Sequence, residues 1–345
     1  MDISELLIFA VENQGSDLHV SAGEQPFIRI HGEMRKVEVE NLDKETVHNM
    51  VYGILNDQQR KAYEEHLELD FSFALGEYGR FRGNVFKQER GDAAVFRSIP
   101  NKIPTFEELG LPKTLMEIAR LEKGLVLVTG PTGSGKSTTL ATMVDLINTE
   151  SKGHIITIED PIEFVHTSKS CLVNQRELGP HTKSFANALR SALREDPDVI
   201  LVGELRDLET ISLALTAAET GHLVFGTLHT SGAPSTVDRV IDVFPAAQQN
   251  QVRSMFAESA QAVVTQALFK RKDGKGRVAS FEILLGSPAV RNLIREGKIF
   301  QILSIMQTSK AMGMQTMEAA VQDLIARNIV NREEVSFYLS NKLQR

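Results

Sequence analysis

Residues 1–98 combine two spacings of apolar positions. Apolar residues three or four positions apart predict amphipathic helices, and alternation with polar residues predicts half-buried strands. Helical spacing occurs near the N-terminus and over residues 46–63. The expected strands cover residues 27–30, 70–75, 80–86 and 94–97. The pattern therefore predicts a small α+β domain at the N-terminus.

From about residue 112 the pattern changes to short apolar runs separated by amphipathic helical segments. The apolar runs lie at residues 125–129, 155–158, 199–202 and 223–227. Strands that are apolar on both faces and alternate with helices are typical of a parallel sheet covered on both sides. We therefore expect an α/β core over residues 112–287.

Two further segments lack this alternation. Pro100 and Pro104 interrupt the stretch between the two blocks, and proline removes a backbone donor and disfavours helix in the residue before it. Residues 99–111 are therefore predicted to form an interdomain linker. From residue 288 onward no strand pattern remains, so residues 288–345 are predicted to form a small helical subdomain.

The composition narrows the class of protein. The chain has 345 residues, of which 42% are hydrophobic and 24% charged, as in a soluble globular protein of about two domains. A formal net charge of −7 disfavours a nucleic-acid-binding protein, and no apolar run approaches the roughly 20 residues that span a bilayer. The acidic N-terminus lacks the basic region of a signal peptide, and Cys171 is the sole cysteine. We therefore expect a cytoplasmic protein that binds no nucleic acid.

Residues 130–137 carry the most specific indication of chemistry. Their sequence GPTGSGKS fits the G-x-x-x-x-G-K-[ST] pattern of a P-loop, whose backbone N–H groups surround phosphate oxygens at a helix N-terminus. The predicted nucleotide-binding residues are Gly130, Pro131, Thr132, Gly133, Ser134, Gly135, Lys136, Ser137 and Thr138. Lys136 is expected to reach the β- and γ-phosphates, and the Ser137 hydroxyl to bind Mg²⁺. The pattern is specific for a nucleoside triphosphate but does not separate ATP from GTP.

A P-loop enzyme also needs carboxylates that hold Mg²⁺ and activate the attacking water. Gly203 stands where many P-loop proteins have Asp, so Glu204 is predicted to take the metal-side role through a water molecule. Glu163 is predicted to polarise the attacking water. Glu159 and Asp160 are expected to support the metal shell or the local turn. The simpler alternatives are that Glu204 caps the next helix and that Glu163 is an ordinary surface acid.

Histidines and arginines supply further candidates. His229 ends an apolar strand and is predicted to sense the γ-phosphate or to contact a neighbouring subunit, whereas His222 is expected to be a cap. Zinc is not expected, because no further ligands stand at a suitable spacing.

Alternation places Arg80 and Arg82 on one face of an expected strand, and Arg97 lies on the next strand. These arginines are predicted to reach a neighbour's nucleotide, with a solvated basic strand face as the alternative.

Several segments together resemble a known family. GPTGSGKST, ITIEDPIEF, LREDPDVILVGELRD and TGHLVFGTLHT resemble the Walker A, Asp-box, Walker B and His-box motifs of the secretion and pilus ATPases. GSDLHVSAG, GRFRGNVF and AVRNLIREGK are similar to segments of the type IV pilus retraction ATPases in particular. The resemblance covers nearly the whole chain.

The resemblance implies an ATP-hydrolysing homohexamer that powers type IV pilus retraction and twitching motility. It implies a PAS-like N-terminal domain and a RecA-like core, with ATP and Mg²⁺ between them. Implied partners are an inner-membrane pilus platform protein and an accessory retraction ATPase, at the cytoplasmic face of the bacterial inner membrane. Residues 289–298 match a segment needed for retraction, with Val290 where Ile is usual. The family's site residues match Glu163, Glu204, His229, Arg82 and Arg97, with Arg80 as a further candidate.

Other classes of protein stay open at this point. Pilus extension and type II secretion ATPases share the chemistry, but they are usually longer and many carry a four-cysteine zinc motif that this chain lacks. The accessory retraction ATPases typically lack the segment present at residues 289–296. The acidic composition disfavours a DNA-translocating ring, and the complete set of acids disfavours a regulator that binds nucleotide without hydrolysing it.

Overall fold

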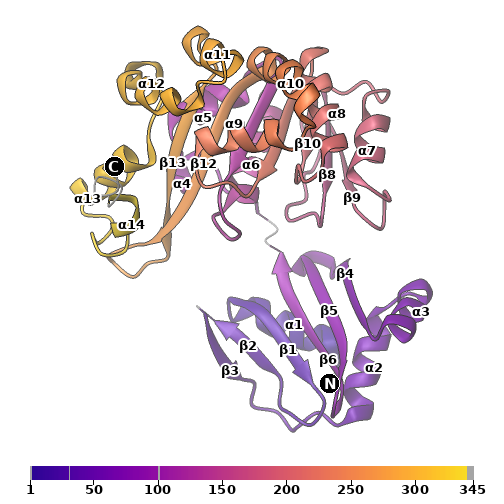
Figure 1. The fold of residues 1–345 in the computed structure, drawn as a ribbon. Helices are drawn as coiled ribbons and strands as arrows, with labels where there is room; N and C mark the ends of the chain where they lie inside the picture. Colours follow the sequence, from indigo (N-terminus) through magenta and orange to yellow (C-terminus); the bar gives the residue numbers. More distant parts are fainter. Residues whose placement is uncertain (1, 31, 100–101, 340–345) are drawn as a thin grey trace. The chain divides into compact units, whose positions relative to one another are not determined.

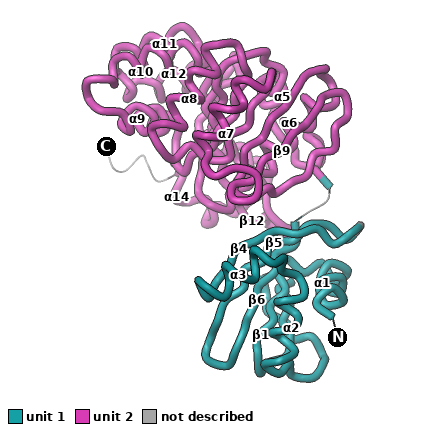
Figure 2. The backbone as a smooth tube through the Cα atoms, turned by 90° about the vertical axis from the view of Figure 1, so that its right-hand side faces the viewer, with its two compact units in different colours: residues 1–102 teal, residues 103–345 magenta. Residues whose placement is uncertain are grey.

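The computed structural model describes residues 2–30, 32–99 and 102–339. The chain divides into two compact units, residues 1–102 and residues 103–345, which Figure 2 colours separately. Unit 1 is built around one main apolar core, and unit 2 has one on each face of its sheet.

Unit 1 is an antiparallel sheet with helices packed against it (Figure 1). In the residues described, the sheet is six-stranded with the order β3-β2-β1-β6-β5-β4. Its strands are β1 (Gly15–Ser21), β2 (Phe27–Ile30), β3 (Glu33–Lys36), β4 (Glu68–Ala74), β5 (Arg80–Gln88) and β6 (Gly91–Ile99). Its helices are α1 (Ile3–Glu12), α2 (Lys44–Ile54) and α3 (Asp57–His66), with a 3₁₀ turn at Gly76–Tyr78. The predicted α+β domain is therefore confirmed.

The helical stretch expected over residues 46–63 is two helices in the structure. The backbone of Leu55 is extended, with ψ of 136°, which ends α2. The side chain of Asn56 then accepts the N–H of Gln59 at 2.9 Å and starts α3. An N-cap asparagine satisfies an N–H that has no partner within the helix, which explains why the chain restarts here.

Unit 2 is built on a largely parallel sheet (Figure 1). Within the described residues this sheet is seven-stranded with the order β13-β12-β7-β11-β10-β8-β9, and only the β12–β13 pair is antiparallel. Its strands are β7 (Gly124–Thr129), β8 (His154–Glu159), β9 (Leu172–Glu177), β10 (Val199–Val202), β11 (Leu223–Leu228), β12 (Ala260–Lys270) and β13 (Arg277–Leu285). The predicted α/β core with a parallel sheet is confirmed.

Helices cover both faces of this sheet (Figure 1). Side chains alternate along β7, so that Leu125 and Leu127 enter one core while Val126 and Val128 enter the other. The first core includes residues of α7 (Phe185–Ala192), α8 (Leu208–Glu219), α9 (Ala233–Asp242), α10 (Ala246–Ser259), α11 (Pro288–Arg295) and α12 (Ile302–Thr308). The second includes residues of α4 (Phe106–Leu109), α5 (Lys113–Ala119) and α6 (Lys136–Glu150). The remaining helical segments are Ile299–Gln301, Lys310–Met312, α13 (Met317–Ala326) and α14 (Ser336–Leu339).

The structure shortens the expected linker, and the described part of the expected tail is helical as predicted. The linker expected over residues 99–111 is shorter, because β6 extends to Ile99 and the buried Phe106 already packs in the core of unit 2. Residues 100–101 of that linker and residues 340–345 of the expected tail lie outside the described residues. The tail from residue 288 belongs to unit 2, since Val290 shares a core with the sheet.

The structure contains, within its described residues, no helix with the length and apolar composition needed to cross a membrane.

Candidate active site

The P-loop connects the fully buried strand β7 to helix α6, which begins at Lys136. Gly130 and Gly135 have φ values of 134° and 88°, in a region that L side chains rarely adopt. A Cβ atom at Gly130 would collide with the carbonyl oxygen of Gln266, and one at Gly135 would lie 2.8 Å from its Nε2 atom. The close approach of the β12 backbone therefore explains the glycine at position 130, and the positive φ explains the one at position 135.

Lys136 is held within the loop. Its Nζ atom donates to the carbonyl oxygens of Gly130 at 2.8 Å and Pro131 at 3.0 Å. Burial lowers the pKa of Lys136, and the negative charges of Glu204 and Glu163 oppose this shift. An arriving phosphate would offer the ammonium group a charged partner in place of two neutral carbonyls, and hydrogen bonds between charged partners are the stronger ones.

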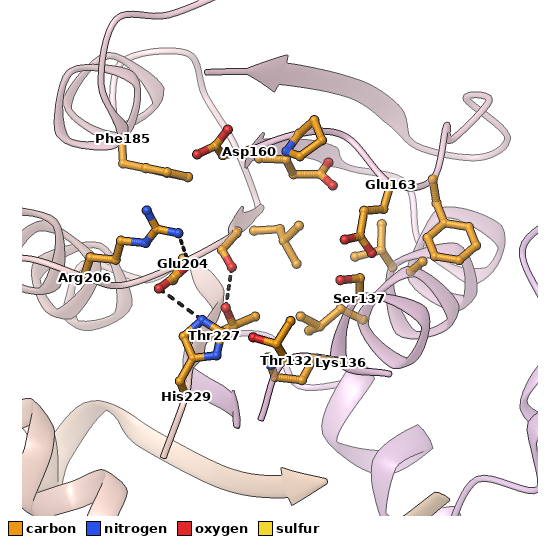
Figure 3. A pocket seen from close by; sticks show the side chains of 18 of the residues that line it. Thr132, Lys136, Ser137, Asp160, Glu163, Phe185, Glu204, Arg206, Thr227 and His229 are labelled. Atoms are coloured by element: carbon orange, nitrogen blue, oxygen red, sulfur yellow. Dashed lines mark hydrogen bonds and ion pairs between the residues drawn. The ribbon is translucent and has the colours of Figure 1, made fainter. Parts of the chain in front are cut away.

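A pocket of about 270 Å³ opens beside the P-loop. It lies along the carboxyl ends of the parallel strands, where ligands bind in open α/β sheets. In Figure 3, Glu204, Arg206 and His229 meet on one side of the pocket, and Ser137 and Glu163 lie on the other. Its lining includes the predicted Thr132, Lys136, Ser137, Glu159, Asp160, Glu163, Glu204 and His229, together with Phe185, Gly203, Arg206 and Thr227.

Glu204 is paired on both of its carboxylate oxygens. Arg206 lies 2.6 Å from Oε2, and Nε2 of His229 lies 3.2 Å from Oε1. The hydrogen bond from Arg206 is the main cause that lowers the pKa of Glu204, so the carboxylate stays ionised at neutral pH. Glu204 and His229, which are 25 residues apart in the numbering, are therefore brought together as a bonded pair.

The acids at the carboxyl end of β8 differ in their surroundings. Burial raises the pKa of Glu159 to about 7, although hydrogen bonds from Thr157 and Gln175 favour its charged form. Near neutral pH Glu159 therefore holds a proton for part of the time, which lessens repulsion among the acids. Glu163 is exposed and faces the pocket, so its carboxylate is free to meet a water molecule.

The surroundings of Gly203 explain why this position does not carry the Asp that many P-loop proteins have here. A Cβ atom at this position would lie 3.0 Å from the carbonyl oxygen of Ile158 and 3.2 Å from Cα of Glu159. Both are backbone atoms of the neighbouring strand, which cannot withdraw as the end of a side chain can. Glu204, one residue later, carries the carboxylate nearest to this position in the sequence, and its metal-side role stays a prediction.

Replacing Gly203 with alanine is expected to destabilise the protein by about 1–3 kcal/mol, because overpacking forces the backbone of β8 to shift. Urea unfolding of the purified variant measures the change. Gly53→Ala is the matched control, since nothing lies within 4 Å of a Cβ at that helical position. It is expected to raise stability by about 0.5–1 kcal/mol. A Gly203→Ala variant as stable as the wild type would contradict this account of the missing Asp.

The predicted arginines lie in unit 1, whereas the residues lining the pocket belong to unit 2. Arg82 and Arg97 are direct partners across β5 and β6. Their like charges are offset by Asp70, 3.8 Å from Arg82, and by the buried Asp17, whose Oδ1 accepts the Nε–H of Arg97 at 2.9 Å. Arg80 donates to the Ser72 hydroxyl at 3.1 Å. Their contact with a neighbour's nucleotide stays a prediction.

The donor set fits magnesium bound together with a nucleotide. The Ser137 hydroxyl and the Glu204 carboxylate line the same pocket. Among the described residues, no group of three or more His, Cys, Asp or Glu side chains could hold a metal ion by itself. Magnesium at nucleotide sites takes one or two protein ligands and completes its shell with phosphate and water oxygens, which this site allows.

The comparison with known proteins decides the family. A model described as "Type II/IV secretion system protein" matches residues 1–336. The chain belongs to this family. It is 58% identical over 333 residues to the type IV pilus retraction ATPase PilT of Pseudomonas aeruginosa, covering 96% of each protein. It is 61% identical over 308 residues to a twitching motility protein of Neisseria gonorrhoeae, covering 89% of this chain and 82% of that protein.

A solved structure also resembles this type II/IV secretion system protein in its fold. The crystal structure of the pilus retraction motor PilT with bound ADP superimposes with a TM-score of 0.93 at 47% sequence identity. The match covers 98% of this chain and 97% of the other. The fold of both units is therefore the fold of this family.

Arg206 and Gln266 are among the site residues of this secretion-system family member that the sequence patterns did not predict. Arg206 follows Glu204 by two positions at the end of a strand, which is a local signal that could have identified it. Gln266 accepts the hydroxyl of Thr139 at 2.8 Å and packs behind the P-loop. Nothing local indicates Gln266, because it reaches the loop only through the pairing of β12 with β7.

Proposed function

We propose that this chain is an ATP-hydrolysing motor that powers type IV pilus retraction. The observation that carries the proposal is the similarity, over almost the entire length of both proteins, to the retraction ATPase of Pseudomonas aeruginosa. The pocket supports it chemically, because it gathers a P-loop lysine, a metal-side carboxylate and a free carboxylate. The bound ADP of the similar PilT structure supports an adenine nucleotide as the ligand.

Binding begins at the P-loop. Its backbone N–H groups and the N-terminus of α6 surround the phosphates, and Lys136 exchanges the carbonyls of Gly130 and Pro131 for phosphate oxygens. Ser137 and Glu204 would hold Mg²⁺, Glu204 through a water molecule. The bound cation supplies positive charge against the charge that develops on the phosphates.

Hydrolysis needs a group that takes a proton from the attacking water. Glu163 is assigned this role, because it is exposed to the pocket. Glu159 is already engaged by Thr157 and Gln175, and Glu204 by Arg206 and His229. His229 is assigned to the γ-phosphate end of the site, where a change in its bond to Glu204 would report cleavage.

The working assembly in this proposal is a homohexamer. Each nucleotide would meet Arg82 and Arg97, and in addition Arg80, from the N-terminal domain of a neighbour, since an arginine supplied in trans accelerates hydrolysis by about 10³–10⁵. ATP binding would close this contact and hydrolysis would release it. The motor would act on an inner-membrane pilus platform protein, together with an accessory retraction ATPase, from the cytoplasmic face of the inner membrane.

The test is ATP turnover as a function of assembly. The purified protein is expected to hydrolyse ATP in the presence of Mg²⁺, with activity per subunit rising as hexamers form on increasing concentration. Light scattering coupled to size-exclusion chromatography gives the assembly state at each concentration. A strictly monomeric preparation with full activity would refute the arrangement in trans, and no turnover at any concentration would refute the ATPase itself.

A further inference from the structure

A buried glutamate on β13 has no place in the mechanism above. Glu282 is 7% exposed, and both of its carboxylate oxygens are bonded to backbone N–H groups. Its Oε1 atom accepts the N–H of Ala233 at 2.7 Å, and its Oε2 atom accepts the N–H of Met317 at 3.2 Å. Ala233 and Met317 are the first residues of α9 and α13, so one carboxylate satisfies two helix N-termini.

Helix α9 depends on this contact more than α13 does. Its N-cap residue is Gly232, which has no side chain to offer, whereas the N-cap of α13, Thr316, accepts the N–H of Ala319 at 3.2 Å. Glu282 thus supplies to α9 the cap that its own sequence lacks. The start of α9 lies four residues after His229, and the short segment between them has no regular structure.

Glu282 also belongs to a row of polar side chains that ends at the P-loop. It pairs directly with Thr265 on β12, and Thr265 pairs with Thr129 on β7. The hydroxyls of Thr129 and Thr265 are 2.8 Å apart, and Thr129 immediately precedes Gly130. The start of α9 is therefore fixed against the same strands that carry the phosphate-binding loop.

We propose that Glu282 is a positioning residue for His229. Glu282 binds the N–H of Ala233 and so fixes the position at which α9 begins. Residues 229–232, which join β11 to α9, are thereby held in place, and His229 stays within reach of Glu204. The inference rests on the proposed ATP hydrolysis and adds to it a residue that lies outside the lining of the pocket.

The two backbone N–H donors that Glu282 accepts from explain why this position carries a carboxylate. A carboxylate presents two acceptor oxygens and faces both N–H groups favourably. A glutamine of the same shape has one oxygen, so its amide NH₂ group must face one of the two backbone N–H donors. Repulsion between this NH₂ group and a backbone N–H is expected to displace the whole side-chain amide, and with it the start of α9, without removing any atom from the pocket.

Steady-state ATP hydrolysis by Glu282→Gln tests the proposal in the assembled protein. The kcat is expected to fall about tenfold or more, because small displacements of a group at the reaction site are costly, while KM for ATP stays within about twofold. In a double-mutant cycle, His229→Ala is expected to cost much less in the Glu282→Gln background than in the wild type, because both changes act on the same contact.

Thr316→Ala is the matched control, because it removes the side-chain cap of α13 and leaves Glu282 in place. It is expected to raise the equilibrium constant of unfolding about fivefold, with kcat unchanged. Glu282→Asp, which keeps the charge on a shorter side chain, replaces Glu282→Gln in the cycle if the glutamine variant does not fold.

Fully additive effects of the Glu282 and His229 substitutions would overturn the proposal. An equal loss of kcat in Thr316→Ala would do the same, because it would show that any weakening of α13 slows hydrolysis. A wild-type protein without ATP turnover overturns this inference together with the proposed function. A wild type that turns over ATP and a Glu282→Gln variant that matches it overturn this inference alone.

Discussion

Glu163→Gln is expected to lower ATP turnover by about 10²–10⁴ while leaving ATP binding within about twofold of the wild type. Glutamine keeps the shape and the hydrogen-bonding reach of the glutamate, but it cannot accept the proton of the attacking water at neutral pH. The P-loop atoms that would hold the phosphates are untouched by the change. Turnover of ATP and equilibrium binding of a fluorescent ATP analogue, measured on one preparation, separate the two effects.

The control for this variant is Glu219→Gln, at the exposed end of α8 and outside the pocket. It is expected to turn over ATP at the wild-type rate. If Glu163→Gln also kept that rate, Glu163 would be an ordinary surface carboxylate. The role of activating water would then pass to Glu159 or Glu204, which the corresponding glutamine variants would decide.

Lys136→Ala is expected to leave cells covered with pili that cannot retract. The substitution removes the ammonium group that is assigned to the β- and γ-phosphates, and a hydrogen bond between charged partners contributes about 1.5–3 kcal/mol. Binding of ATP weakens by at least tenfold on this basis, and turnover falls further because the same charge stabilises the transition state. The measurement is the surface pilus count, with twitching motility, in a strain whose sole copy carries Lys136→Ala.

The outcomes of this experiment distinguish a motor that retracts pili from one that extends them. Abundant pili without motility mean that the ATP-driven step is retraction, as proposed. Cells without pili mean that the motor extends pili. Normal pili with normal motility mean that the protein serves another machine or is redundant. Lys169→Ala is the matched control, since Lys169 forms a surface ion pair with Asp145 and such pairs contribute little to stability.

Local sequence patterns predicted much of the fold. Four apolar runs became β7, β8, β10 and β11, because a strand that is buried on both faces is apolar at nearly every position. Strand β12 was missed because α10 runs directly into it, from Ser259 to Ala260, with no turn residue between them. Strand β9 was missed because it lies at the edge of the sheet and its polar sequence LVNQRE is partly exposed.

For the candidate site, local sequence was enough to identify the P-loop and the acids at the strand ends. These are local features, set by the spacing of neighbouring residues along one strand and one turn. Three contacts emerged only from the folded chain: the bond of Glu204 to His229, the packing of Gln266 behind the P-loop and the bonds of Glu282 to two helices. Each of these contacts depends on which strands become neighbours and in what register, and no local stretch of sequence specifies that choice.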